Sequence, residues 1–464
     1  MKSKFFLIFL LFSGLLLSAQ QDNDKPNLIV IMTDDMGYAD VGFNGCKDIP
    51  TPNIDSIAYN GAHIVNGYVS FPVCGPSRAG FITGRYQDRF GFTTNPTIDP
   101  TNNIAGLPLD EKTIAEVLKT KGYKSAIVGK WHLGTHPNFH PLNRGFDYFY
   151  GFLSGGHNYF MNQLTIENLE NVKSKPAWYR TKLRENHKIL EFEDYKSDYL
   201  TDELSEAALR FIDKQAENDQ AFFLFLAYNA PHGPMQATEK YLSRFPEIQD
   251  KKRKTYAAMV SAVDDGVGNV LRTLKENGIE ENTLIVFLSD NGGARKYASS
   301  NTPLRGFKKD VYEGGIRVPF AIQWKGVIPA NMKYEESVSS LDIMASMVDI
   351  LDIKTNRKKP LDGVNIVPYL TGEKQGAPHD YLFWRKWEQN AMAVIHGDHK
   401  LLKSNKSSES EFYNLKLDVS ESKNIKGSNH VLEKQLQNAW DHWNKKNKDR
   451  IFPTLGEDEW WTEN

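Results

Sequence analysis

Two pairs of oxygen-bearing side chains directly follow apolar runs of the chain. Asp34 and Asp35 come after the run NLIVIM, and Asp290 and Asn291 come soon after the run TLIVFL. Adjacent carboxylates beside a buried strand repel each other and are costly to desolvate, so they need a cation, although a solvated acidic turn would also accommodate them. An all-oxygen set of side chains suits Ca²⁺ better than Mg²⁺ or Zn²⁺. The pattern predicts that these four residues form a calcium site.

Basic and imidazole side chains follow other apolar runs in the same way. Lys130 and His132 come after residues 124–128, and His232 comes after residues 221–227. Taken singly, a lysine usually coats a surface and such a histidine is often only a loop residue. Because polar groups at the carboxyl ends of parallel strands line the ligand crevice, we expect these side chains to lie with the acidic pairs.

Cys74 begins an unusual segment. As bare residues, a cysteine followed by Pro76, Ser77 and Arg78 could be a turn that leads into a helix, and a lone buried cysteine is usually inert. However, CGPSR followed by TGR resembles the signature of the type I, formylglycine-dependent sulfatases of the alkaline phosphatase superfamily, among them bacterial polysaccharide sulfatases. The resemblance continues through PNLIVIMTDDMGYAD, GKWHLG, APHGP, SDNGG and LRGFKKDVYEGGIRVP. It departs at Phe307, where many members have glycine before the lysine.

This resemblance implies a nucleophile that is made after translation. A formylglycine-generating or sulfatase-maturing enzyme would convert Cys74 to formylglycine (3-oxoalanine). In the family, one hydroxyl of the hydrated aldehyde attacks sulfur and expels the alcohol. The other hydroxyl then loses its proton, sulfate is ejected and the aldehyde is regenerated.

The resemblance also implies the roles of the surrounding residues. Ca²⁺ would be held by Asp34, Asp35, Asp290 and Asn291 and would contact residue 74. Arg78 would hold the diol. Lys130 would contact the diol and the sulfate, and His132 would be the base that releases sulfate. His232 and Lys308 would bind the sulfate and protonate the leaving oxygen.

Three further residues are candidates for gripping a sulfated sugar. They are His157, Arg305 and Arg385, for which surface or structural roles are equally open. Aromatic side chains such as Tyr159 and Trp384 could stack on sugar rings or belong to the core.

The elements expected to position these residues are strands alternating with helices. Apolar runs at residues 27–32, 124–128, 221–227, 283–288 and 318–324 read as buried strands, with helical spacing between several of them. This pattern predicts an α/β fold, an alkaline-phosphatase-like sandwich around a mostly parallel central sheet, over residues 26–375. The polar, aromatic residues 165–196 fit an insertion over the site. Residues 376–464 predict a smaller C-terminal α+β subdomain, with an antiparallel sheet and a helix over residues 431–443.

Composition limits the class of protein. The chain has 464 residues, 40% of them apolar, and a formal net charge of −2, which argues against a nucleic-acid partner. Residues 1–19 combine lysines, an apolar run and small residues, which predicts a cleaved signal peptide rather than a membrane anchor. We expect an exported protein, periplasmic or secreted, with no stable membrane anchor. Its two cysteines, Cys46 and Cys74, would allow one disulfide at most, and the setting of Cys74 disfavours it.

We therefore expect a sulfatase acting on a sulfated carbohydrate, such as an algal polysaccharide (ulvan or carrageenan) or a host glycan. Two alternatives stay open. A phosphatase or phosphonate monoester hydrolase could use the same scaffold, and a non-catalytic protein could bind sulfated glycans without cleaving them.

Overall fold

A large twisted sheet forms the centre of the computed structural model, which describes residues 25–172, 174–405, 407, 409–455 and 457. The predicted signal peptide, residues 1–19, lies outside this part. Five parallel strands form the middle of the sheet, in the spatial order β9, β1, β8, β4 and β5. Their bounds are Thr283–Ser289 (β9), Asn27–Thr33 (β1), Phe222–Ala227 (β8), Lys124–Lys130 (β4) and Tyr148–Phe152 (β5).

The strands at the sheet edges break the parallel pattern. β10, predicted from the run at residues 318–324, pairs antiparallel with β9, and β2 pairs antiparallel with β10. At the other edge a hairpin of β6 and β7 extends the sheet from β5. The bounds are Phe320–Gln323 (β10), Ala62–Ile64 (β2), Met332–Tyr334 (β11), Arg184–Glu185 (β6) and Lys188–Ile189 (β7), with a separate pair formed by Gly67–Tyr68 (β3) and Val338–Ser339 (β12).

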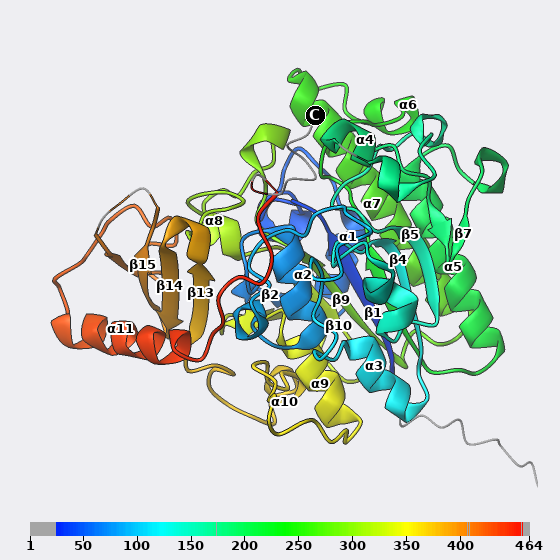
Figure 1. The fold of residues 1–464 in the computed structure, drawn as a ribbon. Coiled ribbons are helices and arrows are strands. Elements are labelled where there is room, and N and C mark those ends of the chain that lie inside the picture. Colours follow the sequence, from blue (N-terminus) through cyan, green and yellow to red (C-terminus); the bar gives the residue numbers. More distant parts are fainter. Residues whose placement is uncertain (1–24, 173, 406, 408, 456, 458–464) are drawn as a thin grey trace, which may run out of the picture.

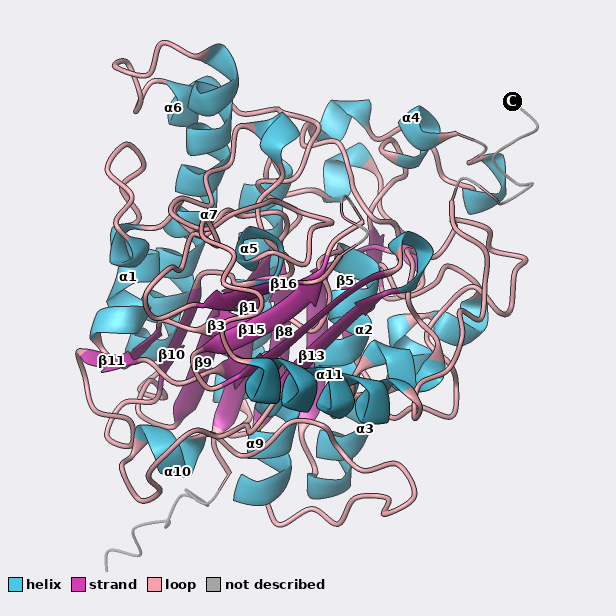
Figure 2. Cartoon of the chain, turned by 90° about the vertical axis from the view of Figure 1, so that its left-hand side faces the viewer, coloured by secondary structure: helices cyan, strands magenta, loops and turns pink. Residues whose placement is uncertain are grey.

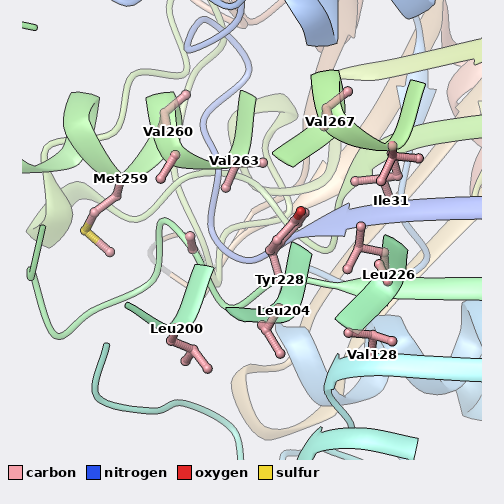
Figure 3. Close-up of a cluster of buried hydrophobic side chains, with 14 of the residues drawn as sticks. Ile31, Val128, Leu200, Leu204, Leu226, Tyr228, Met259, Val260, Val263 and Val267 are labelled. Carbon is pink, nitrogen blue, oxygen red and sulfur yellow. The ribbon is translucent and has the colours of Figure 1, made fainter. Parts of the chain in front are cut away.

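Helices cover both faces of this sheet, as Figure 2 shows. On one face the cluster that contains Ile29 and Ile31 also contains apolar side chains of α1, α5 and α7. Figure 3 shows part of it, where Ile31 and Leu226 of the strands face Leu204 of α5 and Val267 of α7. The helices of this face are Pro52–Tyr59 (α1), Leu200–Glu217 (α5) and Lys251–Glu276 (α7).

The alternate strand residues pack on the opposite face. Leu28 and Val30 share a second cluster with side chains of Cys74–Thr83 (α2), Ile114–Leu118 (α3) and Asp342–Ile350 (α9). Because successive side chains of a strand point to opposite faces, a strand buried on both sides has a continuous apolar run, as residues 28–32 of β1 show. The packed sheet therefore fixes the positions of the residues that follow its strands.

A four-stranded antiparallel sheet forms the smaller C-terminal unit beside the main body (Figure 1). One face of this sheet packs through Trp384 on Tyr68 of the larger unit, with ring centroids 5.4 Å apart. The other face packs on α11 through Phe412 and Leu436. The bounds are Leu382–Lys386 (β13), Ala391–His396 (β14), His399–Lys403 (β15), Glu411–Asn414 (β16) and His430–Asn444 (α11).

The segment predicted as an insertion, residues 165–196, is only partly one. It contains α4 (Lys175–Trp178), and Trp178 lies near His132, with ring centroids 6.3 Å apart. Its second half supplies the β6–β7 hairpin, which belongs to the edge of the main sheet. Three short helices complete the chain: Glu239–Leu242 (α6), Glu313–Ile316 (α8) and Val367–Leu370 (α10). Among the described residues, no helix is both long and apolar enough to cross a bilayer.

Candidate active site

The predicted site residues meet at the carboxyl ends of neighbouring strands. Asp34 and Asp35 follow β1, Asp290 follows β9, and Lys130 is the last residue of β4. All four side chains are fully buried. Cys74, the first residue of α2, is 2% exposed and lies against them: its Sγ and one oxygen each of Asp34 and Asp290 are all within 4.8 Å of one another.

The acidic pairs leave three oxygens without hydrogen-bond partners among the described residues. Asn291 Nδ2 donates to Asp35 Oδ1 at 2.7 Å, and the Asp35 amide donates to Asp290 Oδ1 at 3.3 Å. Asp34 Oδ1, Asp35 Oδ2 and Asn291 Oδ1 have no partner there. Buried polar atoms are nearly always hydrogen-bonded, so three such oxygens together fit a hard cation such as Ca²⁺.

Each carboxylate is paired with one cationic side chain. Lys130 Nζ lies 2.7 Å from Asp34 Oδ2, Arg78 Nε lies 2.8 Å from Asp290 Oδ2, and Lys308 Nζ lies 2.5 Å from Asp35 Oδ1. Arg78 also donates to the Lys130 carbonyl at 3.1 Å, while its Nη2 has no partner among the described residues. A divalent cation added to three acids and three bases would give the centre a net positive charge, which favours an anionic substrate.

Burial and neighbouring charges set the pKa values of the acids in opposite directions. Burial raises the pKa of Asp290 to about 6, and the nearby Asp34 adds to this rise. Burial also raises the pKa of Asp35, but Lys308 and His232 outweigh it and hold that pKa well below its usual range. A bound cation would favour the ionised form of all of them.

The two histidines are neutral in this setting. Burial lowers the pKa of His132 far below its ordinary value, and Lys130 and Arg78 lower it further. Neither ring nitrogen of His132 has a partner among the described residues. Burial lowers the pKa of His232 to about 3, against the effect of Asp35. His232 Nδ1 donates to the Gly233 carbonyl at 2.6 Å, which leaves its Nε2 as an acceptor 3.8 Å from Asp35 Oδ2.

Cys74 lies beside a lysine and at the first residue of a helix. Its Sγ is 3.8 Å from Lys308 Nζ, and the N-terminus of α2 favours negative charge at this position. Asn95 Oδ1 lies 3.7 Å from the same Sγ and accepts from the Gly75 amide at 2.9 Å. Both Cys46 and Cys74 are free thiols, so the disfavoured disulfide is absent from the structure.

Two of the three candidate sugar contacts have structural roles instead. His157 is fully buried, with its ring nitrogens 3.0 Å from the Asn158 carbonyl and 2.7 Å from the Thr181 carbonyl. Arg385 is 5% exposed, and its guanidinium donates to Asp88 at 2.9 Å and to Asn444 at 3.0 Å. Both groups are therefore buried and bonded to protein atoms in this structure.

The third candidate, Arg305, is exposed but also held by protein atoms. Its Nη1 donates to Tyr413 Oη at 3.0 Å and to the Glu421 carbonyl at 2.9 Å, and its guanidinium lies over the Tyr312 ring. These contacts connect the loop that contains Lys308 to the smaller unit. Tyr159 and Trp384 are also buried, as core side chains are.

Several residues that lie near the centre of the site were not singled out from the sequence. Asn95 contacts Cys74 from a loop, and Tyr297 lies beside His232 with ring centroids 5.2 Å apart. Burial raises the pKa of Tyr179 to about 12, and the nearby Asp34 raises it further. Only the aromatic character of residues 165–196 pointed toward Tyr179.

The sequence matches two family profiles. The Sulfatase profile matches residues 26–353, and the profile described as N-sulphoglucosamine sulphohydrolase, C-terminal, matches residues 306–446. N-acetylgalactosamine-6-sulfatase of Mus musculus is 33% identical over 408 residues, which cover 85% of this chain and 75% of that protein.

Solved structures resemble the protein over almost its whole length. Ps i-CgsB, solved in complex with k-i-k-neocarrahexaose, has a TM-score of 0.85 and 38% identity, covering 93% of this chain and 96% of the other. The PsFucS1 sulfatase from Pseudoalteromonas sp. has a TM-score of 0.77 and 26% identity, covering 93% of each chain.

Proposed function

Because this chain belongs to the sulfatase family, with its alkaline-phosphatase-like fold, we propose that it is an exported sulfatase that uses a formylglycine at position 74 and Ca²⁺. As a sulfuric ester hydrolase it acts on sulfate esters of carbohydrates. The position of Cys74 is the observation that most directly supports the proposed mechanism. Its Sγ lies beside the buried carboxylates and 3.8 Å from the Lys308 ammonium.

Ca²⁺ would be held by Asp34, Asp35, Asp290 and Asn291. The unpartnered oxygens of Asp34, Asp35 and Asn291 support this assignment. When bound, the ion would neutralise negative charge and lower the pKa of a hydroxyl on residue 74.

A hydrated aldehyde at position 74 would supply two hydroxyls in place of one thiol, so the nucleophile can be renewed after each turnover. Here the Sγ of Cys74 stands for the position of such a hydroxyl. Arg78, held by Asp290 and the Lys130 carbonyl, would orient the diol through its unpartnered Nη2. The maturing enzyme that oxidises Cys74 would be an obligatory partner in the cell.

The other cationic and imidazole side chains would bind sulfate and move protons. Lys130 and Lys308 present ammonium groups to the oxygens of the sulfate group. Although burial lowers the pKa of Lys308, Asp35 and Cys74 outweigh it and raise that pKa, so Lys308 stays charged. His132, neutral and with both ring nitrogens unpartnered among the described residues, suits the base that removes the second hydroxyl proton. His232 Nε2 would contact the sulfate or the leaving oxygen.

The proposed substrate is an extracellular polysaccharide or oligosaccharide. The likeness to Ps i-CgsB, whose structure contains k-i-k-neocarrahexaose, supports a carrageenan-like algal glycan as the first to test, ahead of ulvan and host glycans. Export by the segment 1–19, to the periplasm or outside the cell, would bring the enzyme to such a substrate. In this proposal residues 26–375 form the catalytic domain and residues 376–464 the C-terminal subdomain.

The test is sulfate release measured by ion chromatography, on protein produced together with a maturing enzyme. We expect Cys74→Ala to lower sulfate release by more than about 10³-fold, because the nucleophile is lost. The matched control, Cys46→Ala, removes the other cysteine and should keep full activity. Mass spectrometry of the wild-type peptide should find an aldehyde in place of the Cys74 thiol.

Full activity of Cys74→Ala would refute the proposed mechanism. Faster turnover of an aryl phosphate or a phosphonate diester than of an aryl sulfate would favour the alternative hydrolases. Tight glycan binding without sulfate release from fully modified protein would instead favour the binding protein.

A further inference from the structure

Lys386 is a buried cation at the end of a strand in the smaller unit. It is the last residue of β13 and is 3% exposed. It pairs with Ala391, which belongs to the same cluster as Leu382 and Trp384. Side chains alternate along a strand, so Lys386 lies on the sheet face that is turned toward the catalytic domain.

Two segments near Cys74 lie close to the end of β13. Lys386 is close enough to Lys309 for their charges to interact, and the Lys309 amide donates to the Pro72 carbonyl at 2.9 Å. Glu388, two residues after Lys386, is hydrogen-bonded to Thr94, and the next residue, Asn95, lies 3.7 Å from Cys74 Sγ. The end of β13 therefore borders the approach to the nucleophile.

The ammonium of Lys386 has no hydrogen bond or ion pair within the described part of the chain. Glu388 and Asp310 lie near enough to attract it, but neither contacts it at ion-pair distance. Burial lowers the pKa of Lys386 to about 8; Glu388 and Asp310 oppose this effect, and Lys309 adds to it. Buried charges in proteins are normally paired, which leaves an anionic ligand as the missing partner.

We propose that Lys386, with Lys309 beside it, binds a second anionic group of the substrate, a sulfate or a carboxylate on the sugar that carries the scissile sulfate or on the next one. This inference rests on the proposed function and deepens it, because it makes the preferred substrate a glycan with at least two negative charges. The smaller unit then selects the substrate, while the catalytic domain cleaves it.

The test compares two oligosaccharides that differ only in one additional sulfate, together with a small aryl sulfate. Lys386→Met keeps the length and the apolar stem of the side chain and removes the charge. We expect kcat/KM for the more highly sulfated oligosaccharide to fall about 10-fold or more, mainly through KM, since a charged contact is lost. Turnover of the aryl sulfate should change by less than about twofold.

Lys403→Met is the matched control. Lys403 lies on the opposite face of the same sheet, paired with Met392. Lys386 and Lys403 both line a cavity of about 730 Å³ at the end of this sheet near α11. Lys403→Met should leave the preference for the second sulfate unchanged, whereas a loss shared by both variants would place the anion in that cavity and overturn the proposal.

Two other outcomes would also overturn the proposed role of Lys386. If Lys386→Met lowered kcat/KM equally for all three substrates, the lysine would have only a structural role. If the wild-type enzyme did not prefer the second sulfate or a matching carboxylate, there would be no anion subsite. If wild-type protein containing the aldehyde released no sulfate from any substrate, the proposed function itself would fail, a result distinct from these.

Discussion

Asn291 has the least ambiguous link to a cation, because its amide nitrogen is used by Asp35 while its oxygen is left without a partner among the described residues. A ligand that binds only the folded protein stabilises it by about 2.7 kcal/mol at 100 times its Kd. We therefore expect Ca²⁺ to raise the Tm of the wild-type protein. Asn291→Leu removes one ligand oxygen without changing charge, and it should weaken Ca²⁺ binding by ~10-fold or more.

Thermal unfolding across a series of Ca²⁺ concentrations measures this effect without any need for activity. Asn138→Leu, at an exposed position away from the site, is the control and should keep the Tm rise of the wild type. An Asn291→Leu protein that responds to Ca²⁺ as the wild type does would remove this residue from the metal site.

At the residue scale, the sequence predicted the side chains whose chemistry depends on local spacing. Asp34, Asp290 and Lys130 lie close together because each stands at or just after the end of a buried strand, and these ends converge in a parallel sheet. The contacts of His157 and Arg385 were not predicted, because their partners, Thr181 and Asp88, are distant in sequence. Nothing in a single sequence shows such partners in advance.

At the element scale, apolar run length decided which strands could be predicted. The long runs of β1, β8 and β9 were found nearly to the residue, while β2 and β6 are two or three residues long and have no pattern to read. The helix expected over residues 431–443 spans His430–Asn444. Its apolar stripe was readable because half of its surface faces solvent.

The attachment of α11 to the small sheet gives a test at the same scale. Leu436 is fully buried against a cluster that contains Phe412 and Leu401. Leu436→Ala should lower the free energy of unfolding of the C-terminal unit by ~2–5 kcal/mol, from lost burial and the cavity left behind. Hydrogen exchange of the α11 amides measures this local stability.

Leu417→Ala removes the same atoms from a side chain that is 85% exposed, and it should change stability by less than ~0.5 kcal/mol. Equal exchange rates in the two variants would show that α11 does not depend on this contact.

At the scale of the whole molecule, a buried charge cluster joins the two units. Lys400 Nζ of β15 lies 2.8 Å from Glu313 Oε1 of α8 and 2.8 Å from Glu421 Oε1. Tyr68 Oη donates to Glu313 Oε2 at 2.9 Å, and the Glu313 amide donates to Glu421 Oε2 at 2.7 Å. Because α8 follows Lys308 by only a few residues, this cluster also holds the loop that contains Lys308.

The cluster makes the stability of the assembled molecule depend on pH. Burial raises the pKa of Glu421 from 4.5 to about 7, and Glu313 adds to the rise although Lys400 opposes it. The folded protein therefore keeps a proton on Glu421 that the unfolded chain releases, so the free energy of unfolding falls as the pH rises from 4.5 to about 7. Glu421→Gln keeps a neutral group there and should flatten this slope by roughly 1–3 kcal/mol over the interval, measured by urea unfolding. Glu409→Gln, which alters a glutamate that is 78% exposed, should keep the wild-type slope. If Glu421→Gln did so too, Glu421 would be ionised throughout, and the two units would be joined by a fully charged cluster whose contribution does not change with pH.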